Sequence, residues 1–191
     1  MKKISNNKGF TLVEVIIALA IMSIIGIGIV QVMTSAARTK TGIEREVEYQ
    51  NITSELISTV RNELANVSMV QVVGNASVDL NEVDANGEKY CYIVSAATTG
   101  GVTIHSLDSA GNRVSTTIRE NNNPNVLSYM SFKKNTNSIE ISAIIERIDM
   151  TDASGAFVKP YTQSTTMAMD PNVLSDAATG YQGAIKYKKI K

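Results

Sequence analysis

The sequence predicts an α+β fold in which one long amino-terminal α-helix packs on an antiparallel β-meander. Three observations predict it. Residues 15–37 form an uncharged stretch of 23 residues, almost all of them apolar. Apolar residues then recur every three or four positions from Tyr49 to Val67, as on one face of an amphipathic helix. Beyond Gly74 the chain changes to short runs of β-forming residues separated by turn residues.

The uncharged stretch is typical of a membrane span, because at about 1.5 Å per residue it can cross a bilayer core of about 30 Å. Three lysines precede it, and only Arg38 and Lys40 follow closely, which favours a cytoplasmic amino terminus. A secretory signal peptide cleaved near Ala37 is a second interpretation, but its apolar region would exceed the roughly 7–15 residues expected. A plain single-span anchor is a third, and it leaves Glu14, at the start of the apolar segment, unexplained.

A specific motif opens this segment. Residues 8–14 are Lys-Gly-Phe-Thr-Leu-Val-Glu, after a short basic leader and before the long apolar helix. The arrangement resembles the class III signal of type IV pilins and pseudopilins, and the resemblance covers residues 1 to about 35. It implies a pilin-like fold and a membrane-embedded aspartic peptidase that cleaves between Gly9 and Phe10 and then N-methylates Phe10. It also places the family's glutamate at Glu14, with the hydroxyl residue Thr11 in the same motif.

The chemistry of these residues supports a role in assembly. Cleavage would leave a new amine at Phe10, a cation with a reference pKa of about 8. Four residues of helix separate that amine from Glu14, about 6 Å along the axis, so the two can pair within one chain or between staggered chains. Because an unpaired charge in an apolar environment is costly, Glu14 is predicted to set the register between helices. Phe10, Thr11 and Glu14 are therefore the candidate assembly residues.

The resemblance also implies a function and partners. The chain would be a structural subunit, major or minor, of a type IV pilus-like filament that supports adhesion, motility, secretion or DNA uptake. Its partners would be other pilins in a helical filament, a prepilin peptidase, and an assembly platform with its ATPase. It would lie first in the bacterial cytoplasmic membrane and then in a surface pilus or pseudopilus. The alternative is a single-pass anchored or secreted binding domain that joins no filament.

Four segments follow from these patterns: a leader removed from the mature protein (1–9), a membrane or filament-core helix (10–37), the amphipathic half of the same helix (38–73) and a β-rich head (74–191). The head should contain a strand at 89–95, hairpins formed by 102–107 with 113–119 and by 127–133 with 139–148, and an edge strand within 157–169 limited by Pro160.

Composition excludes several other classes of protein. The chain has 18 Lys plus Arg, 18 Asp plus Glu, one Cys and one His. One Cys and one His exclude an internal disulfide framework and a zinc site of the usual ligand count. Cys91 is predicted to be a buried small hydrophobe and His105 a structural or surface residue. With no catalytic constellation visible, we expect no enzymatic activity and no cofactor.

The net charge of zero hides a segregated distribution, because two basic ends enclose a body of net charge −7. The carboxyl end holds Lys186, Lys188, Lys189 and Lys191. These four lysines could contact nucleic-acid phosphates, but four charges would contribute only modest, salt-sensitive binding. A solvated tail, or one that pairs with the acidic body of a neighbouring subunit, is the favoured interpretation.

Overall fold

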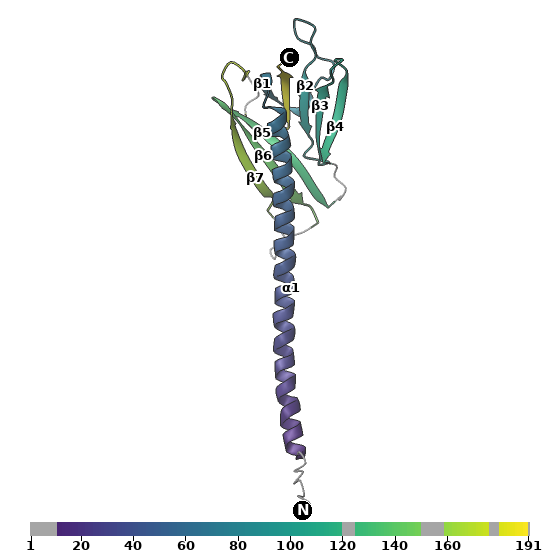
Figure 1. The fold of residues 1–191 in the computed structure, drawn as a ribbon, viewed down its shortest axis with the longest axis vertical. Helices are drawn as coiled ribbons and strands as arrows, with labels where there is room; N and C mark the ends of the chain where they lie inside the picture. The colour runs from purple at the N-terminus through teal and green to yellow at the C-terminus, as the bar shows by residue number, and fades with distance from the viewer. Residues whose placement is uncertain (1–10, 120–124, 150–158, 176–179, 191) are drawn as a thin grey trace, which may run out of the picture. The chain divides into compact units, whose positions relative to one another are not determined.

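The computed structural model describes residues 11–119, 125–149, 159–175 and 180–190, and Figure 1 labels its elements. The chain divides into two compact units, residues 1–47 and 48–191. The elements within the described residues are α1 (Leu12–Glu63), β1 (Val67–Val73), a short 3-10 turn (Asn75–Ser77), β2 (Cys91–Ser95), β3 (Val102–Leu107), β4 (Arg113–Arg119), β5 (Val126–Asn135), β6 (Ser138–Arg147), β7 (Tyr161–Ala168) and β8 (Ala184–Lys189).

The first unit consists, in its described part, of α1 alone. Every residue from Thr11 to Val47 is exposed. The helix continues without interruption through Gly26 and Gly28, where an added Cβ would meet nothing within 4 Å. A helix that is apolar on all sides and has no protein around it requires lipid or other helices to cover it.

The end of α1 corrects one sequence-based prediction. The helix ends at Glu63 instead of near Val73, and β1 occupies residues 67–73. The apolar spacing carried on to Val67 and suggested a longer helix. However, β1 has the sequence Val-Ser-Met-Val-Gln-Val-Val, and such a β-branched run gains more by joining a sheet than by extending a helix.

Five strands form one antiparallel sheet in the order β1-β8-β2-β3-β4. The last strand of the chain, β8, is inserted between β1 and β2, with Val70 opposite Tyr187 and Tyr187 opposite Cys91. The hairpin of β3 and β4 has the predicted bounds, and its loop places Gly111 at φ +80°. The antiparallel α+β class is confirmed, although the strand order is not sequential.

The other three strands form a second antiparallel sheet in the order β5-β6-β7. β5 and β6 pair along ten residues, as the predicted hairpin required. β7 begins just after Pro160 and is an edge strand, as predicted. Phe132 of β5 exchanges two backbone hydrogen bonds of 2.8 Å with Gln182, just before β8, so the carboxyl-terminal segment joins the two sheets.

The core of the second unit lies between the end of α1 and the two sheets. Ile52, Leu56 and Val60 of α1, and Leu64 just after its end, recur every four residues and are at most 7% exposed. They belong to one buried cluster with residues of both sheets, among them Val70, Ile93, Phe132, Ile141, Ile185 and Tyr187. Each such side chain contributes about 1.5–3 kcal/mol when fully buried, so this stripe holds the unit together.

Candidate functional site

The amino-terminal end of α1 holds the described part of the predicted processing and assembly motif. Gly9 and Phe10 lie outside the described residues. Thr11 precedes the first helical residue, and its backbone N–H and its hydroxyl donate to Glu14 Oε2 at 2.8 and 2.9 Å. In return, the Glu14 N–H donates to Thr11 Oγ1 at 3.3 Å. These reciprocal bonds form a capping box, which satisfies orphan donors of the first helical turn.

The capping box is a role for Thr11 that the sequence analysis missed, although the spacing Thr-x-x-Glu before an apolar run is its known signature. It fixes the Glu14 carboxylate at the very start of the helix, on the side of the chain where Phe10 joins. The helix N-terminus itself also favours a negative charge at this position. The Glu14 carboxylate is therefore positioned by hydrogen bonds from Thr11 of its own chain, without a contribution from a neighbouring subunit.

The apolar part of α1 is long enough to span a membrane. Within the described residues it is the one helix that meets this test of length and composition, and none of its most apolar window is buried. The exposed large side chains run from Leu12 to Met33. Such a contiguous apolar surface marks a membrane or protein interaction site.

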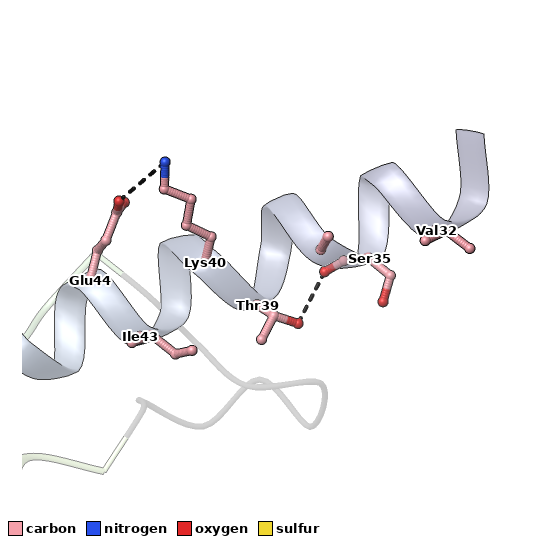
Figure 2. Close-up of a pocket in the computed structure, with 7 residues that line it drawn as sticks. Val32, Ser35, Thr39, Lys40, Ile43 and Glu44 are labelled. Carbon is pink, nitrogen blue, oxygen red and sulfur yellow. Dashed lines mark hydrogen bonds and ion pairs between the residues drawn. The ribbon is translucent and has the colours of Figure 1, made fainter. Parts of the chain in front are cut away.

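A shallow groove lies where the uncharged stretch of α1 ends. Val32, Ser35, Ala36, Thr39 and Ile43 line it, together with Lys40 and Glu44 (Figure 2). Figure 2 shows the two charged side chains joined in an ion pair, whose Nζ–Oε1 distance is 3.7 Å. The groove thus has an apolar floor with both signs of charge beside it.

The lysines at the carboxyl end do not form a solvated tail. Lys186, Lys188 and Lys189 lie in β8, and Lys191 lies outside the described residues. Lys186 pairs with Glu82, and Lys189 Nζ lies 2.8 Å from Glu63 Oε1 at the end of α1. The prediction of a solvated tail is therefore wrong. Ile185 and Tyr187, which are alternate residues of this segment, are buried in a central strand.

Most of these ion pairs attach residues 79–90, which connect the short 3-10 turn to β2, to strand β8. We call this segment the strap. Lys188 pairs with Asp84 and Glu88 of the strap. The hydrogen bond from Lys188, aided by the Glu88 N–H, lowers the pKa of Asp84 to about 2, and the same carboxylates raise the pKa of Lys188. Arg113 of β4 adds a hydrogen bond of 3.0 Å to the Tyr90 carbonyl oxygen. The strap is therefore held by side chains of two strands.

The strap also covers a buried tyrosine. Tyr92 is fully buried and its hydroxyl donates to Glu82 Oε2 at 2.6 Å. The bond from Lys186, followed by the bond from Tyr92, lowers the pKa of Glu82. Burial, with Glu82 beside it, raises the pKa of the Tyr92 hydroxyl. Lys186 Nζ lies 4.1 Å from the ring centroid of Tyr90, which adds a cation–π contact.

Comparison with known proteins connects this geometry to a family. Residues 4–30 match the family described as the prokaryotic N-terminal methylation motif. The fold resembles the PilB minor pilin from Streptococcus sanguinis, with a TM-score of 0.51, 14% identity, and coverage of 77% of this chain and 35% of that protein. The chain has the prokaryotic N-terminal methylation motif and a fold similar to that of this minor pilin. A mutant of the same PilB pilin aligns at a TM-score of 0.47 with 16% identity, over 73% of this chain and 34% of the other.

The pilin-like chain spans about a third of the length of the solved pilin that it resembles. No curated protein matches it by sequence. The shared features are thus the methylation motif and a fold of one long helix on antiparallel sheets, and they agree with the resemblance drawn from residues 8–14.

The surroundings of Cys91 and His105 indicate that both residues have structural roles. Cys91 is a free thiol that is only 3% exposed, and burial raises its pKa. His105 Nδ1 lies 2.7 Å from Ser115 Oγ, and burial lowers its pKa. Among the described residues, no group of three His, Cys, Asp or Glu side chains could hold a metal ion.

Proposed function

We propose that the chain is a structural subunit of a type IV pilus-like filament. It would be made as a prepilin, cleaved between Gly9 and Phe10, N-methylated on Phe10 and polymerised through α1. The proposal rests on two features that occur together at the amino-terminal end, the methylation motif and the exposed apolar helix. A methylation motif over residues 4–30 includes the start of a helix whose most apolar segment is entirely exposed.

The capping box suggests how Glu14 acts in assembly. Its carboxylate already accepts two hydrogen bonds from Thr11, and further lone pairs remain for a cation. After cleavage, the cation nearest in the chain is the amine of Phe10, about 6 Å away along the helix axis. When helices leave lipid for a filament core, the Phe10 amine of a staggered neighbour can form the same ion pair with Glu14. A charge left unpaired in that core would be strongly destabilising.

The partners follow from this route. A prepilin peptidase would remove the leader, a membrane platform driven by an ATPase would extract the subunit, and copies of this chain or sister pilins would receive it. The subunit would await assembly as a single-pass protein with its amino terminus in the cytoplasm. Its role is assembly, without catalysis or cofactor. A nucleic-acid role through the β8 lysines is disfavoured, because Lys186, Lys188 and Lys189 already pair with carboxylates of the same chain.

The amino-terminal mass of the protein from bacterial membranes tests processing. A product that begins at methylated Phe10 supports the proposal. A product that begins near Ala37 to Thr39 indicates a secreted protein, and an intact Met1 indicates an anchored domain, and either result would overturn it. Gly9→Val should leave the leader attached, whereas the matched control Gly26→Val adds the same side chain where an added Cβ meets nothing within 4 Å and should be processed normally.

A second experiment tests assembly. Glu14→Val should be cleaved normally but be absent from sheared filaments, because the neighbour's amine would lose its partner. Glu55→Val, at an exposed position on the same helix, should be incorporated like the wild type. Normal incorporation of Glu14→Val would contradict the charge-register role of Glu14.

A further inference from the structure

A polar hollow of about 460 Å³ lies over strands β2, β3 and β4, which are neighbours in the five-stranded sheet (Figure 1). Hydroxyl and basic side chains make up its polar lining, and they come from Thr99, Thr103, His105, Thr117 and Arg119. Within the described part of the chain, no carboxylate lines it. The hollow therefore suits a neutral or anionic ligand and not a cation.

A β-bulge directs Arg119 into this hollow. Thr103 of β3 is opposite Thr117 of β4 in the register, whereas the preceding residue, Val102, is opposite Arg119, so β4 has one residue more than β3 at this point. Val102 is fully buried in the core. Arg119 nevertheless lines the hollow together with Thr117. Bulges often re-aim a side chain next to a functional site, and this one brings a guanidinium beside a pair of hydroxyls.

The turn at residues 99–101 forms one wall of the hollow and is fixed by its own chain. The Gly101 N–H donates to the Ser128 carbonyl oxygen at 2.7 Å, and the Ala96 N–H donates to the Gly101 carbonyl oxygen at 3.3 Å. Gly101 has φ of +94°, and a Cβ there would lie 3.1 Å from the Arg119 carbonyl oxygen. The turn thus lies against the end of β4, and a ligand would not have to order it on binding.

Arg119 supplies the positive charge of the hollow at neutral pH. Burial lowers the pKa of His105, so its ring is neutral at pH 7, and its Nδ1 already lies 2.7 Å from Ser115 Oγ. A second hollow, beside the strap, contains Lys188 and Lys189, but both lysines pair with carboxylates of the chain. The hollow on β2, β3 and β4 is therefore the better candidate for an anion from outside the chain.

We propose that this hollow binds an acidic sugar, with Arg119 on its carboxylate and the hydroxyls of Thr103 and Thr117 on its ring hydroxyls. A guanidinium presents two parallel N–H donors to a carboxylate. The two threonine oxygens lie 3.5 Å apart, and each can donate and accept, as sugar hydroxyls require. Val94 and Ala96 add small apolar side chains that can contact the C–H groups of the ring. The inference goes beyond the proposed function, because binding by the head does not require assembly.

Calorimetric titration of the full chain in detergent micelles tests the ligand class. Glucuronate should bind saturably, and glucose, which lacks the carboxylate, should bind about tenfold more weakly or less. Inorganic phosphate should also bind more weakly than glucuronate, because it has no ring for the threonines and the apolar side chains to contact. Absence of saturable glucuronate binding, or glucose or phosphate binding as tightly as glucuronate, would overturn the inference.

Variants of the lining test the assigned contacts. Arg119→Gln should weaken glucuronate binding about tenfold and leave glucose binding unchanged, whereas Arg119→Lys keeps the charge without the fork and should weaken it about threefold. Thr117→Val, at an exposed position, should weaken both sugars about two- to fivefold. The control Lys159→Gln removes one positive charge from an exposed position outside the hollow and should have no effect. Urea unfolding verifies that each variant is folded, and Thr117→Val still tests the site if changes at Arg119 prevent folding.

An oligomer of glucuronate distinguishes a free sugar acid from a residue of a polysaccharide. Equal affinity for the oligomer and the monosaccharide indicates a single sugar residue, tighter binding of the oligomer indicates a polysaccharide, and either result supports the site if it depends on Arg119. Glucuronate binding that is unchanged in both Arg119→Gln and Thr117→Val would contradict it. These outcomes are separate from the proposed function, since loss of sugar binding leaves filament assembly possible and failed assembly leaves the titration unaffected.

Discussion

Tyr187→Phe is the perturbation that best tests how the end of α1 is attached to the sheet. Tyr187 lies in the central strand β8, is fully buried, and donates its hydroxyl to Glu63 Oε1 at 2.5 Å. Burial, with Glu63 beside it, raises the pKa of this hydroxyl far above its ordinary value, so Tyr187 stays protonated and remains a donor. Phenylalanine keeps the ring and its packing and removes only the donor.

The magnitude follows from the partner's charge. A hydrogen bond to a charged group contributes about 1.5–3 kcal/mol, and the loss of one oxygen leaves no sizeable cavity. Glu63 retains Lys189, 2.8 Å away, so its carboxylate is not left without a partner. We therefore expect Tyr187→Phe to lower the free energy of unfolding by about 1.5–2 kcal/mol. Lys189→Gln should cost less than about 1 kcal/mol, because that lysine side chain is 45% exposed.

Urea unfolding of the full chain in detergent micelles, followed by circular dichroism, measures both values. The two variants share Glu63, so their effects should not be additive in the double variant. A Tyr187→Phe protein within about 0.5 kcal/mol of the wild type would refute the assigned weight of this bond. So would a larger loss for Lys189→Gln than for Tyr187→Phe.

Three further predictions concern the same unit. Leu56→Ala should cost about 2–5 kcal/mol in the same unfolding assay, because Leu56 is 1% exposed, whereas Glu55→Ala should stay within about 0.5 kcal/mol. The pKa of Asp84 falls from 3.8 to about 2 on folding, so its contribution to stability is complete above pH 3.8 and is lost as the pH falls towards 2. Asp84→Asn should flatten the acid side of the stability–pH curve over that range, and an unchanged curve would contradict this. Gly101→Ala should destabilise by about 1–3 kcal/mol, because φ is +94° and the new Cβ would lie 3.1 Å from the Arg119 carbonyl oxygen. A stability equal to that of the wild type would disprove the strain.

Local patterns predicted the parts of the fold that local chemistry determines. The β3–β4 hairpin was found with its bounds because alternating β-formers flank a turn-rich loop that ends in Gly111 and Asn112. The uncharged stretch and the motif at residues 8–14 could likewise be recognised from neighbouring residues in the sequence. The Thr-x-x-Glu spacing of Thr11 and Glu14 is the signature of the capping box seen in the structure. The sequence-based prediction for Glu14, however, was only that it pairs with the amine of Phe10.

The missed features depend on contacts between distant residues. Helix spacing continued to Val67, and only the pairing of β1 with β8, more than a hundred residues later, makes residues 67–73 a strand. The lysines of β8 obscured its period-two pattern, in which Ile185 and Tyr187 point to the core. Their partners in the strap were unforeseeable from spacing, because an ion pair across two strands has no local signature.

The position of β8 imposes an order on folding. Val67 pairs with Lys189, and the strand that separates β1 from β2 follows all the other described strands in the sequence. The five-stranded sheet therefore cannot close until β8 has paired with both β1 and β2. Such non-local pairing is slow, since the loop must close before its contacts form. Until then β1 and β2 both present unpaired edges, which are covered only when residues 184–189 dock between them.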